Sequence, residues 1–180
     1  MRTPPAARGI TLIELAIVVA VVAVTASAAA PALGAFIETR RIDGIASQLA
    51  LDLQEARAEA IRRRSGVRFT VHQAAWGSCY VVHTGSASQC RCEPTGRALC
   101  DGGAQALRTV QLDAGGRLGV QANVASIRFD PLHGTATPAG TLKVTAASGR
   151  TVHQVVNVMG RVRSCTVPGA APAVPGYRPC

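Results

Sequence analysis

The feature that most constrains this chain is an apolar segment near its start, ITLIELAIVVAVVAVTASAAAPALGAFI, at residues 10–37. Its only charged residue is Glu14, and about 20 apolar residues suffice for a helix to cross a bilayer. Arg2 and Arg8 precede the segment with no acidic residue between them. This arrangement places residues 1–9 on the cytoplasmic side of a membrane and the rest of the chain outside. We therefore predict a single-pass membrane protein with an exported globular part.

Glu14 distinguishes this segment from a plain membrane anchor, because a carboxylate inside a membrane helix is costly and indicates a function. A secretory signal peptide is cleaved after its apolar run, whereas here Arg8-Gly9 stands before the run. The stretch Gly9-Ile10-Thr11-Leu12-Ile13-Glu14-Leu15 resembles the class III signal of type IV pilins and pseudopilins. Ile10 departs from the family pattern, in which phenylalanine is commonest at that site.

This resemblance implies a processing route and a place in the cell. A prepilin peptidase is expected to cleave the leader, residues 1–9, between Gly9 and Ile10 and to methylate Ile10. Glu14 is expected to pair with the N-terminal amine of a neighbouring subunit during fibre assembly. The protein is then expected in the inner membrane with a periplasmic globular domain, and at the cell surface once it joins other pilins in a pilus.

Beyond residue 37 the sequence predicts that the helix continues as an amphipathic helix over residues 38–66. Glu59 is placed to pair with Arg62 or Arg63, and Ser65-Gly66 is a typical helix stop. Apolar residues recur at spacings of three and four, which makes one stripe for the core: Ile42, Ile45, Leu49, Leu53, Ala56 and Ala60.

From residue 67 the hydrophobic period changes to two, which indicates strands. About six antiparallel strands are predicted in a β domain over residues 67–165. Together with the long helix this gives an α+β, pilin-like fold, in which antiparallel sheets pack on the second half of the helix. The six runs are Val67–His72, Cys79–His83, Arg108–Leu112, Ser126–Phe129, Thr141–Val144 and Val152–Val158.

Six cysteines in a small exported domain indicate up to three disulfides. Cys165 and Cys180 enclose a proline-rich tail, residues 166–180, and we predict that they form one bond. The remaining four lie in a segment, 78–107, that resembles no known part of the family, and their pairing stays open. A zinc site is disfavoured because the spacing in that segment is not the usual two-residue knuckle. The four are Cys79, Cys90, Cys92 and Cys100.

The residues do not favour an enzyme. The four histidines lie on separate predicted strands and loops without an acid or cysteine at metal-ligand spacing, so no metal is predicted. Paired cysteines offer no reactive thiol, and no glycine-rich loop opens a helix after a strand, so no phosphate-binding loop or cofactor is predicted.

The charge is strongly basic, with 19 basic and 10 acidic residues. After residue 65 there are 11 basic and 4 acidic residues, which favours an anionic partner. Lys143 is the only lysine. The use of arginine suits phosphate binding, although a GC-rich genome produces the same bias.

The second half of the chain carries a narrower resemblance. Gln54–Arg63, Ile127–Gly134 and Val155–Arg163 are similar to the GspH/FimT group of minor pilins and pseudopilins. In the FimT branch a Gly-Arg-x-Arg motif binds DNA during natural transformation, and Gly160-Arg161-Val162-Arg163 matches that motif.

If the last strand reaches Arg163, a period of two puts Arg161 and Arg163 on one face and Val162 in the core. Gly160 is expected to mark a bulge or strand break. The tail is expected to bring Tyr177 and Arg178 to the same edge, where the tyrosine could stack a base. Two further cations on neighbouring strands are expected to extend the patch: Lys143 and Arg150. The structural alternative is that these charges only protect a sheet edge from aggregation.

Two main hypotheses follow. In the first, the protein is a minor type IV pilin that binds double-stranded DNA without sequence preference. In the second, it is a structural pseudopilin of a type II secretion system that binds no nucleic acid. A third is a priming or adhesive minor pilin that uses the cysteine-rich segment as its contact surface.

Overall fold

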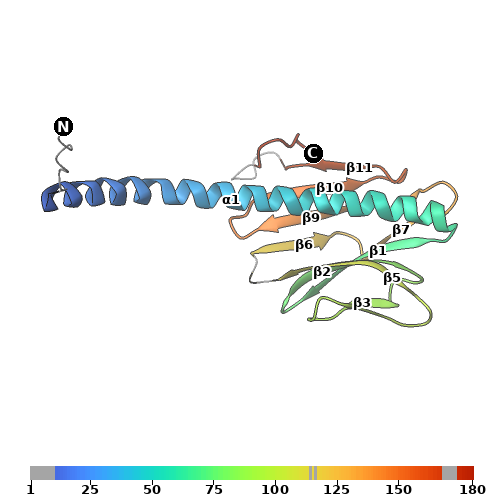
Figure 1. The fold of residues 1–180 in the computed structure, drawn as a ribbon. Coiled ribbons are helices and arrows are strands. Elements are labelled where there is room, and N and C mark those ends of the chain that lie inside the picture. Colours follow the sequence, from blue (N-terminus) through green and yellow to red (C-terminus); the bar gives the residue numbers. More distant parts are fainter. Residues whose placement is uncertain (1–10, 114, 116, 168–173) are drawn as a thin grey trace, which may run out of the picture. The chain divides into compact units, whose positions relative to one another are not determined.

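The computed structural model describes residues 11–113, 115, 117–167 and 174–180 (Figure 1). The chain divides into two compact units, Met1–Glu38 and Thr39–Cys180. Gly9 and Ile10, where cleavage and methylation are expected, lie outside the described residues. The two units are described separately below.

The first unit contains the start of helix α1, which runs from Leu12 to Arg63. Thr11 and Glu14 cap its beginning reciprocally: the Glu14 backbone N–H donates to Thr11 Oγ1 at 3.3 Å, and the Thr11 N–H donates to Glu14 Oε2 at 3.4 Å. All residues from 11 to 37 are exposed. By length and composition, α1 is a helix that could cross a membrane.

In the second unit, α1 buries one face, as the predicted apolar stripe requires. Its fully buried apolar residues are Ile42, Ala46, Leu49, Leu53, Ala56 and Ala60, while Ile45 is only partly buried. Each residue of this buried set follows the preceding one by three or four positions, so the set forms a single helical face.

The helix ends earlier than the sequence predicts. The last helical residue is Arg63, and Arg64 rather than Gly66 takes the left-handed conformation, with φ of 50°. The Ser65 N–H donates to Ala60 O at 3.2 Å and the Arg64 N–H to Ile61 O at 3.2 Å, which is a Schellman closure. Gly66 instead leaves room for the side chain of Arg128.

Three antiparallel sheets follow (Figure 1). A five-stranded sheet has the order β5-β2-β1-β7-β8, a four-stranded sheet has the order β11-β10-β9-β6, and β3 pairs only with β4. The strands are β1 (Val67–Ala74), β2 (Gly77–Thr84), β3 (Cys90–Cys92), β4 (Ala98–Cys100), β5 (Ala106–Asp113), β6 (Leu118–Ala122), β7 (Ser126–Phe129), β8 (Ala136–Thr137), β9 (Gly140–Ala146), β10 (Thr151–Val156) and β11 (Val162–Cys165).

All six predicted strands are present, as β1, β2, β5, β7, β9 and β10. Strands β3, β4, β6, β8 and β11 were not predicted. The four shortest of these have two to four residues, too few for an alternating pattern to stand out. The prediction that the strand from Val152 continues to Val158 is wrong, because β10 ends at Val156 and the chain turns there.

Both large sheets pack on α1 through one core. Buried residues of the five-stranded sheet, among them Phe69, Tyr80 and Phe129, join those of the four-stranded sheet, among them Leu142 and Val144, in one cluster with the helix. Every buried residue of this cluster lies between Ile42 and Val174, inside the second unit. Residues that alternate with the core residues along each strand therefore point away from the helix.

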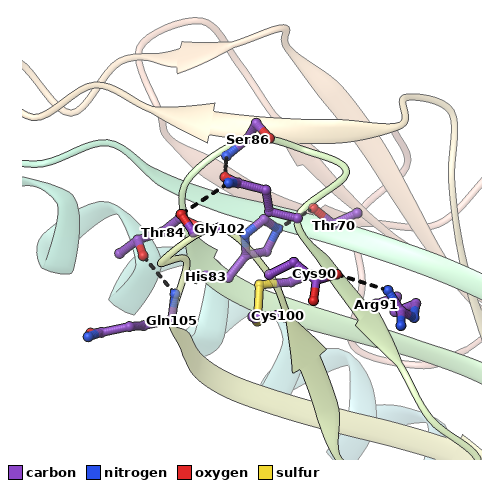
Figure 2. The surroundings of a disulfide bond; sticks show 11 residues. Thr70, His83, Thr84, Ser86, Cys90, Arg91, Cys100, Gly102 and Gln105 are labelled. Carbon is purple, nitrogen blue, oxygen red and sulfur yellow. Dashed lines mark hydrogen bonds and ion pairs between the residues drawn. A yellow bond between two sulfur atoms is a disulfide. The ribbon is translucent and has the colours of Figure 1, made fainter.

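The structure contains three disulfides: Cys79–Cys92, Cys90–Cys100 and Cys165–Cys180. The first two settle the pairing that the sequence left open. Cys79–Cys92 attaches β3 to β2, and Cys90–Cys100 links β3 to β4; Figure 2 shows Cys90–Cys100 beside the buried His83 and Thr70. The segment 78–107 is thus not one insertion: residues 77–84 form a strand of the main sheet, because their alternate side chains complete the core.

Candidate nucleic-acid interface

The Gly-Arg-x-Arg motif begins in the tight turn between β10 and β11. The Asn157 N–H donates to Arg161 O at 3.1 Å, and the Gly160 N–H donates to Asn157 O at 2.8 Å. Gly160 has φ of 70°, so this is a three-residue hairpin loop whose last residue needs glycine. The expected bulge or break at Gly160 is therefore a hairpin turn, and Arg161 closes it.

A second turn fixes the position of this hairpin. A Cβ atom on Gly160 would lie 2.3 Å from the carbonyl oxygen of Gly134, so the two turns touch through backbone. The same Gly134 oxygen accepts a hydrogen bond from Arg57 Nε at 2.9 Å, and Val158 O accepts one from the Ala136 N–H at 2.9 Å. The hairpin is therefore held by β8 and by the turn before it, and α1 holds that turn through Arg57.

The strand register places Arg163 on the face of the sheet opposite to that of Val162. Val156 pairs with Val162 and Val155 with Arg163, and Val162 packs against the core. Since side chains alternate along a strand, Arg163 points away from the helix, whereas Arg161 precedes β11 and closes the turn. Both are exposed.

A groove of ≈ 570 Å³ lies beside the motif, between the last turns of α1 and the start of β11. Arg57, Ala58 and Ile61 line it on the helix, and Gly160 and Arg161 line it on the turn. The motif is thus at the edge of a hollow rather than on a flat surface.

The other predicted cations lie at increasing distance from the motif. Lys143 in β9 is exposed and pairs with His153 in β10, which pairs in turn with Cys165 in β11. It therefore shares the outer face of the four-stranded sheet with Arg163, roughly 10 Å away across two strand spacings. Lys143 also affects its neighbour: burial first and then this ammonium group lower the pKa of His153.

The structure does not bring Arg178 and Arg150 into the motif. Arg178 is held at the far end of β11, where its carbonyl accepts the Thr166 N–H at 3.0 Å. Arg150 precedes β10 and so lies at the opposite end of that strand from the 157–161 turn, roughly 20 Å away along the strand. Only Arg161 and Arg163 are adjacent, with Lys143 next.

The role expected for Tyr177 in base stacking is not supported. Its hydroxyl donates to Asp43 Oδ1 in α1 at 2.6 Å, and its side chain packs against the core. Burial first and then this hydrogen bond raise the pKa of Tyr177 to about 12. Tyr177 fastens the tail to the helix because a half-buried phenol needs a hydrogen-bond partner.

The part of the sequence that carries the motif is basic, and its nearest preceding carboxylate is Asp130. Residues 131–180 include five basic residues and no Asp or Glu. Within the described part of the chain, no ion pair is recorded for Lys143, Arg161, Arg163 or Arg178. Exposed cations without an ion pair of their own attract anions from outside the molecule.

A second hollow lies between α1 and strands β2 and β5. It differs from the groove beside the motif because its charged groups pair with each other. Asp52 in α1 is 1% exposed and accepts hydrogen bonds from Tyr80 Oη at 2.6 Å and Arg108 Nε at 2.8 Å. Gln48 Nε2 also donates to it, at 2.8 Å. These opposite charges satisfy each other, so the arrangement fits a structural link between the helix and the five-stranded sheet. No sequence pattern predicted this link.

Over the described residues, no group of three or more His, Cys, Asp or Glu side chains is arranged to hold a metal ion. Two histidines serve in the packing instead. His83 is fully buried, with Nε2 2.9 Å from Thr70 Oγ1 and Nδ1 2.8 Å from Thr84 O. Burial lowers the pKa of both His72 and His83, which favours their neutral forms.

Comparison with known proteins agrees with this architecture. A family model described as type II transport protein GspH matches residues 46–160. Two crystal structures of the type IV minor pilin FimU from Pseudomonas aeruginosa have a similar fold, with TM-scores of 0.52 and 0.51 at 20% and 18% identity. The first alignment covers 74% of this chain and 92% of FimU, and the second 73% and 98%. No curated protein sequence matches this chain.

Proposed function

The chain belongs to the GspH family of minor pilins and pseudopilins, and from this premise we propose that it binds double-stranded DNA without sequence preference. Gly160, Arg161 and Arg163 form the centre of the binding surface, and Lys143 extends it over the outer face of the four-stranded sheet. The biological role is capture of extracellular DNA for uptake in natural transformation, by a subunit of a type IV pilus.

One observation carries the proposal: a backbone-anchored hairpin exposes Arg161 and Arg163 two residues apart, and no ion pair is recorded for either in the described residues. Two arginines two residues apart lie roughly 7 Å apart at the backbone, and each guanidinium group can donate to a phosphate oxygen. Neither arginine reads a base edge in this arrangement, because phosphate contacts carry affinity without sequence information.

The contribution of the more distant cations depends on the length of the DNA. Arg178 and Arg150 lie at the far ends of β11 and β10, so a duplex has to run along the sheet to reach them. We assign them a long-range electrostatic role, which is weak at physiological salt because the Debye length is about 8 Å.

The resemblance to pilins also supports proposals for the processing, assembly and location of the chain. Prepilin peptidase cleavage between Gly9 and Ile10, methylation of Ile10 and a role of Glu14 in packing against a neighbouring subunit are proposed on the resemblance of residues 9–15 to the class III signal. In this isolated subunit the Glu14 carboxylate caps its own helix, and a neighbour's amine could replace that contact. The proposed location is the inner membrane with a periplasmic domain, and then the pilus.

The second candidate is a structural pseudopilin of a type II secretion system, which the family description favours. Such a subunit needs the same helix and the same fold, so those features do not separate the two. The exposed Arg161 and Arg163, for which no ion pair is recorded in the described residues, favour the first candidate, because a purely structural subunit has no need for unpaired cations there.

The test is binding of the full-length chain, in neutral detergent, to a fluorescent mixed-sequence duplex at low salt. We expect a dissociation constant of about micromolar or weaker, which is typical of non-specific DNA binding. The double variant Arg161→Ala and Arg163→Ala should bind several-fold more weakly. A matched control removes two exposed arginines of the cysteine-rich hairpin, Arg91→Ala and Arg97→Ala, and should change binding little.

Absence of binding by the unmodified chain, or equal binding by the Arg161/Arg163 double variant, would refute the DNA proposal and favour the secretion pseudopilin. A chain whose affinity differs strongly between two unrelated duplex sequences would contradict the sequence-independent part of the proposal.

A further inference from the structure

The five-stranded sheet presents a second pair of arginines that the motif does not include. Arg68 in β1 lies directly opposite Arg128 in β7. Arg68 alternates with the buried Val67 and Phe69, and Arg128 alternates with the buried Ile127 and Phe129. Both arginines therefore point away from the core, on the outer face of the five-stranded sheet.

This pairing is unfavourable within the protein itself. Side chains directly opposite each other on antiparallel strands have Cβ atoms about 5 Å apart, and like charges in that position destabilise the sheet. Arg68 makes only neutral contacts: its Nε donates to Gly85 O at 3.2 Å and its Nη1 to Ser126 Oγ at 3.0 Å. No carboxylate is recorded in an ion pair with either arginine in the described residues.

The backbone makes room for the exposed member of the pair. A Cβ atom at Gly66 would lie 2.8 Å from Arg128 Nε and 2.9 Å from its Nη2. Glycine at this position therefore lets the guanidinium group lie flat against the chain after α1. The guanidinium groups of Arg68 and Arg128 thus stay close together. Separating them, or adding an acidic neighbour, would lower the electrostatic energy of the folded protein.

The pair also lies close to the Gly-Arg-x-Arg hairpin. Arg128 pairs with Thr137 in β8, and the neighbouring Ala136 donates its N–H to Val158 O in the hairpin turn at 2.9 Å. One short strand thus separates the two groups of arginines, roughly 5 Å per strand spacing. Arg163, Arg68 and Arg128 project from the side of their sheets that faces away from α1.

We propose that Arg68 and Arg128 are a second contact site for the same DNA duplex, so that one backbone runs from Arg163 past the hairpin turn and β8 to Arg128. This inference rests on the proposed DNA binding and deepens it by adding residues that the motif does not contain. A phosphate between the two guanidinium groups supplies the negative charge that their cross-strand position lacks. Arg128, the exposed member, carries most of this contact.

The test compares Arg128→Ala with Arg97→Ala, an exposed arginine of the cysteine-rich hairpin, in the full-length chain in neutral detergent. With the same mixed-sequence duplex at low salt, Arg128→Ala should weaken binding about three- to fivefold and lower the slope of log K against log salt by about one. Its melting temperature should stay equal or rise, because the repulsion from Arg68 is removed. Arg97→Ala should change neither binding nor slope.

Three results overturn the inference. If the unmodified chain binds no DNA, the proposed function and this inference fail together. If the Arg161/Arg163 double variant binds weakly but Arg128→Ala binds normally, only this inference fails. If Arg128→Ala leaves DNA binding intact but changes self-association in analytical ultracentrifugation, the arginine pair serves a protein partner instead.

Discussion

Two places in this domain use arginine in opposite ways. Between α1 and the five-stranded sheet, Arg108 contacts the buried carboxylate of Asp52, which also binds Tyr80. At the β10–β11 hairpin, Arg161 and Arg163 are exposed in a segment of the sequence without an acidic residue. The charges of the first arrangement pair with each other inside the domain, so its role is stability. No ion pair is recorded for the arginines of the second in the described residues, and we propose that their role is to bind an anion from outside the protein.

The largest effect is expected at Asp52. Asp52→Ala leaves the Tyr80 hydroxyl and Arg108 without their acceptor inside the domain, and breaking a buried charged pair costs about 3 kcal/mol. The midpoint of urea unfolding should fall accordingly. DNA binding by the protein that remains folded should be unchanged, since Asp52 is remote from the hairpin motif.

Asp101 provides the matched control, because its pair with Arg91 at 3.1 Å is exposed on both sides. Asp101→Ala should change the free energy of unfolding by less than about 1 kcal/mol. Equal losses for the two variants would mean that Asp52 is not the structural link described here.

A smaller effect is expected from a change at Gly160, which should lower both the stability of the domain and its affinity for DNA. Gly160→Ala adds a Cβ atom in a left-handed conformation and 2.3 Å from Gly134 O. We expect a loss of about 2 kcal/mol in stability, and weaker DNA binding because the hairpin has to move with Arg161.

The control is Gly103→Ala, which has φ of 80° but nothing within 4 Å of the added atom. It should cost about 1 kcal/mol from the backbone alone and leave DNA binding unchanged. If both variants lose the same stability and neither loses affinity, the contact between the two turns does not position the motif.

The smallest effect is expected from pH. Burial is the main cause that lowers the pKa of His72, His83 and His153 below the usual 6.5. As the pH falls below about 6.5 the unfolded chain binds protons that the folded chain resists, so stability decreases toward pH 5. Urea midpoints at pH 8 and pH 5 measure this. His83→Gln should flatten the profile, whereas a midpoint that rises toward acid would contradict the sign.

Much of the fold follows from the sequence because its signals are periodic. The buried face of α1 is a repeat of three and four that tertiary contacts need not modify, and Val67–His72 and Ser126–Phe129 alternate clearly enough to locate β1 and β7. Short elements such as β8, with two residues, carry no such signal. Their existence depends on neighbours distant in sequence.

The candidate site was only partly predictable for the same reason. The exposure of Arg163 opposite the core residue Val162 follows from the period of two, whereas the place of Arg161 in the hairpin turn depends on where the strand begins. The role of Arg57 and the opposition of Arg68 and Arg128 depend on contacts across 77 and about 60 residues of chain, which no local pattern encodes. Tyr177 was misassigned because the sequence does not show that Asp43 lies beside it.

The most direct test of the central claim is the salt dependence of duplex binding by the unmodified chain and by two double variants. We predict that Arg161→Ala with Arg163→Ala lowers the slope of log K against log salt by about one to two, because each lost phosphate contact releases about one counterion fewer. Arg91→Ala with Arg97→Ala removes the same charge from the cysteine-rich hairpin and should leave the slope unchanged. Equal slopes for the two double variants would show that total charge, and not the anchored Arg161–Arg163 pair, determines binding.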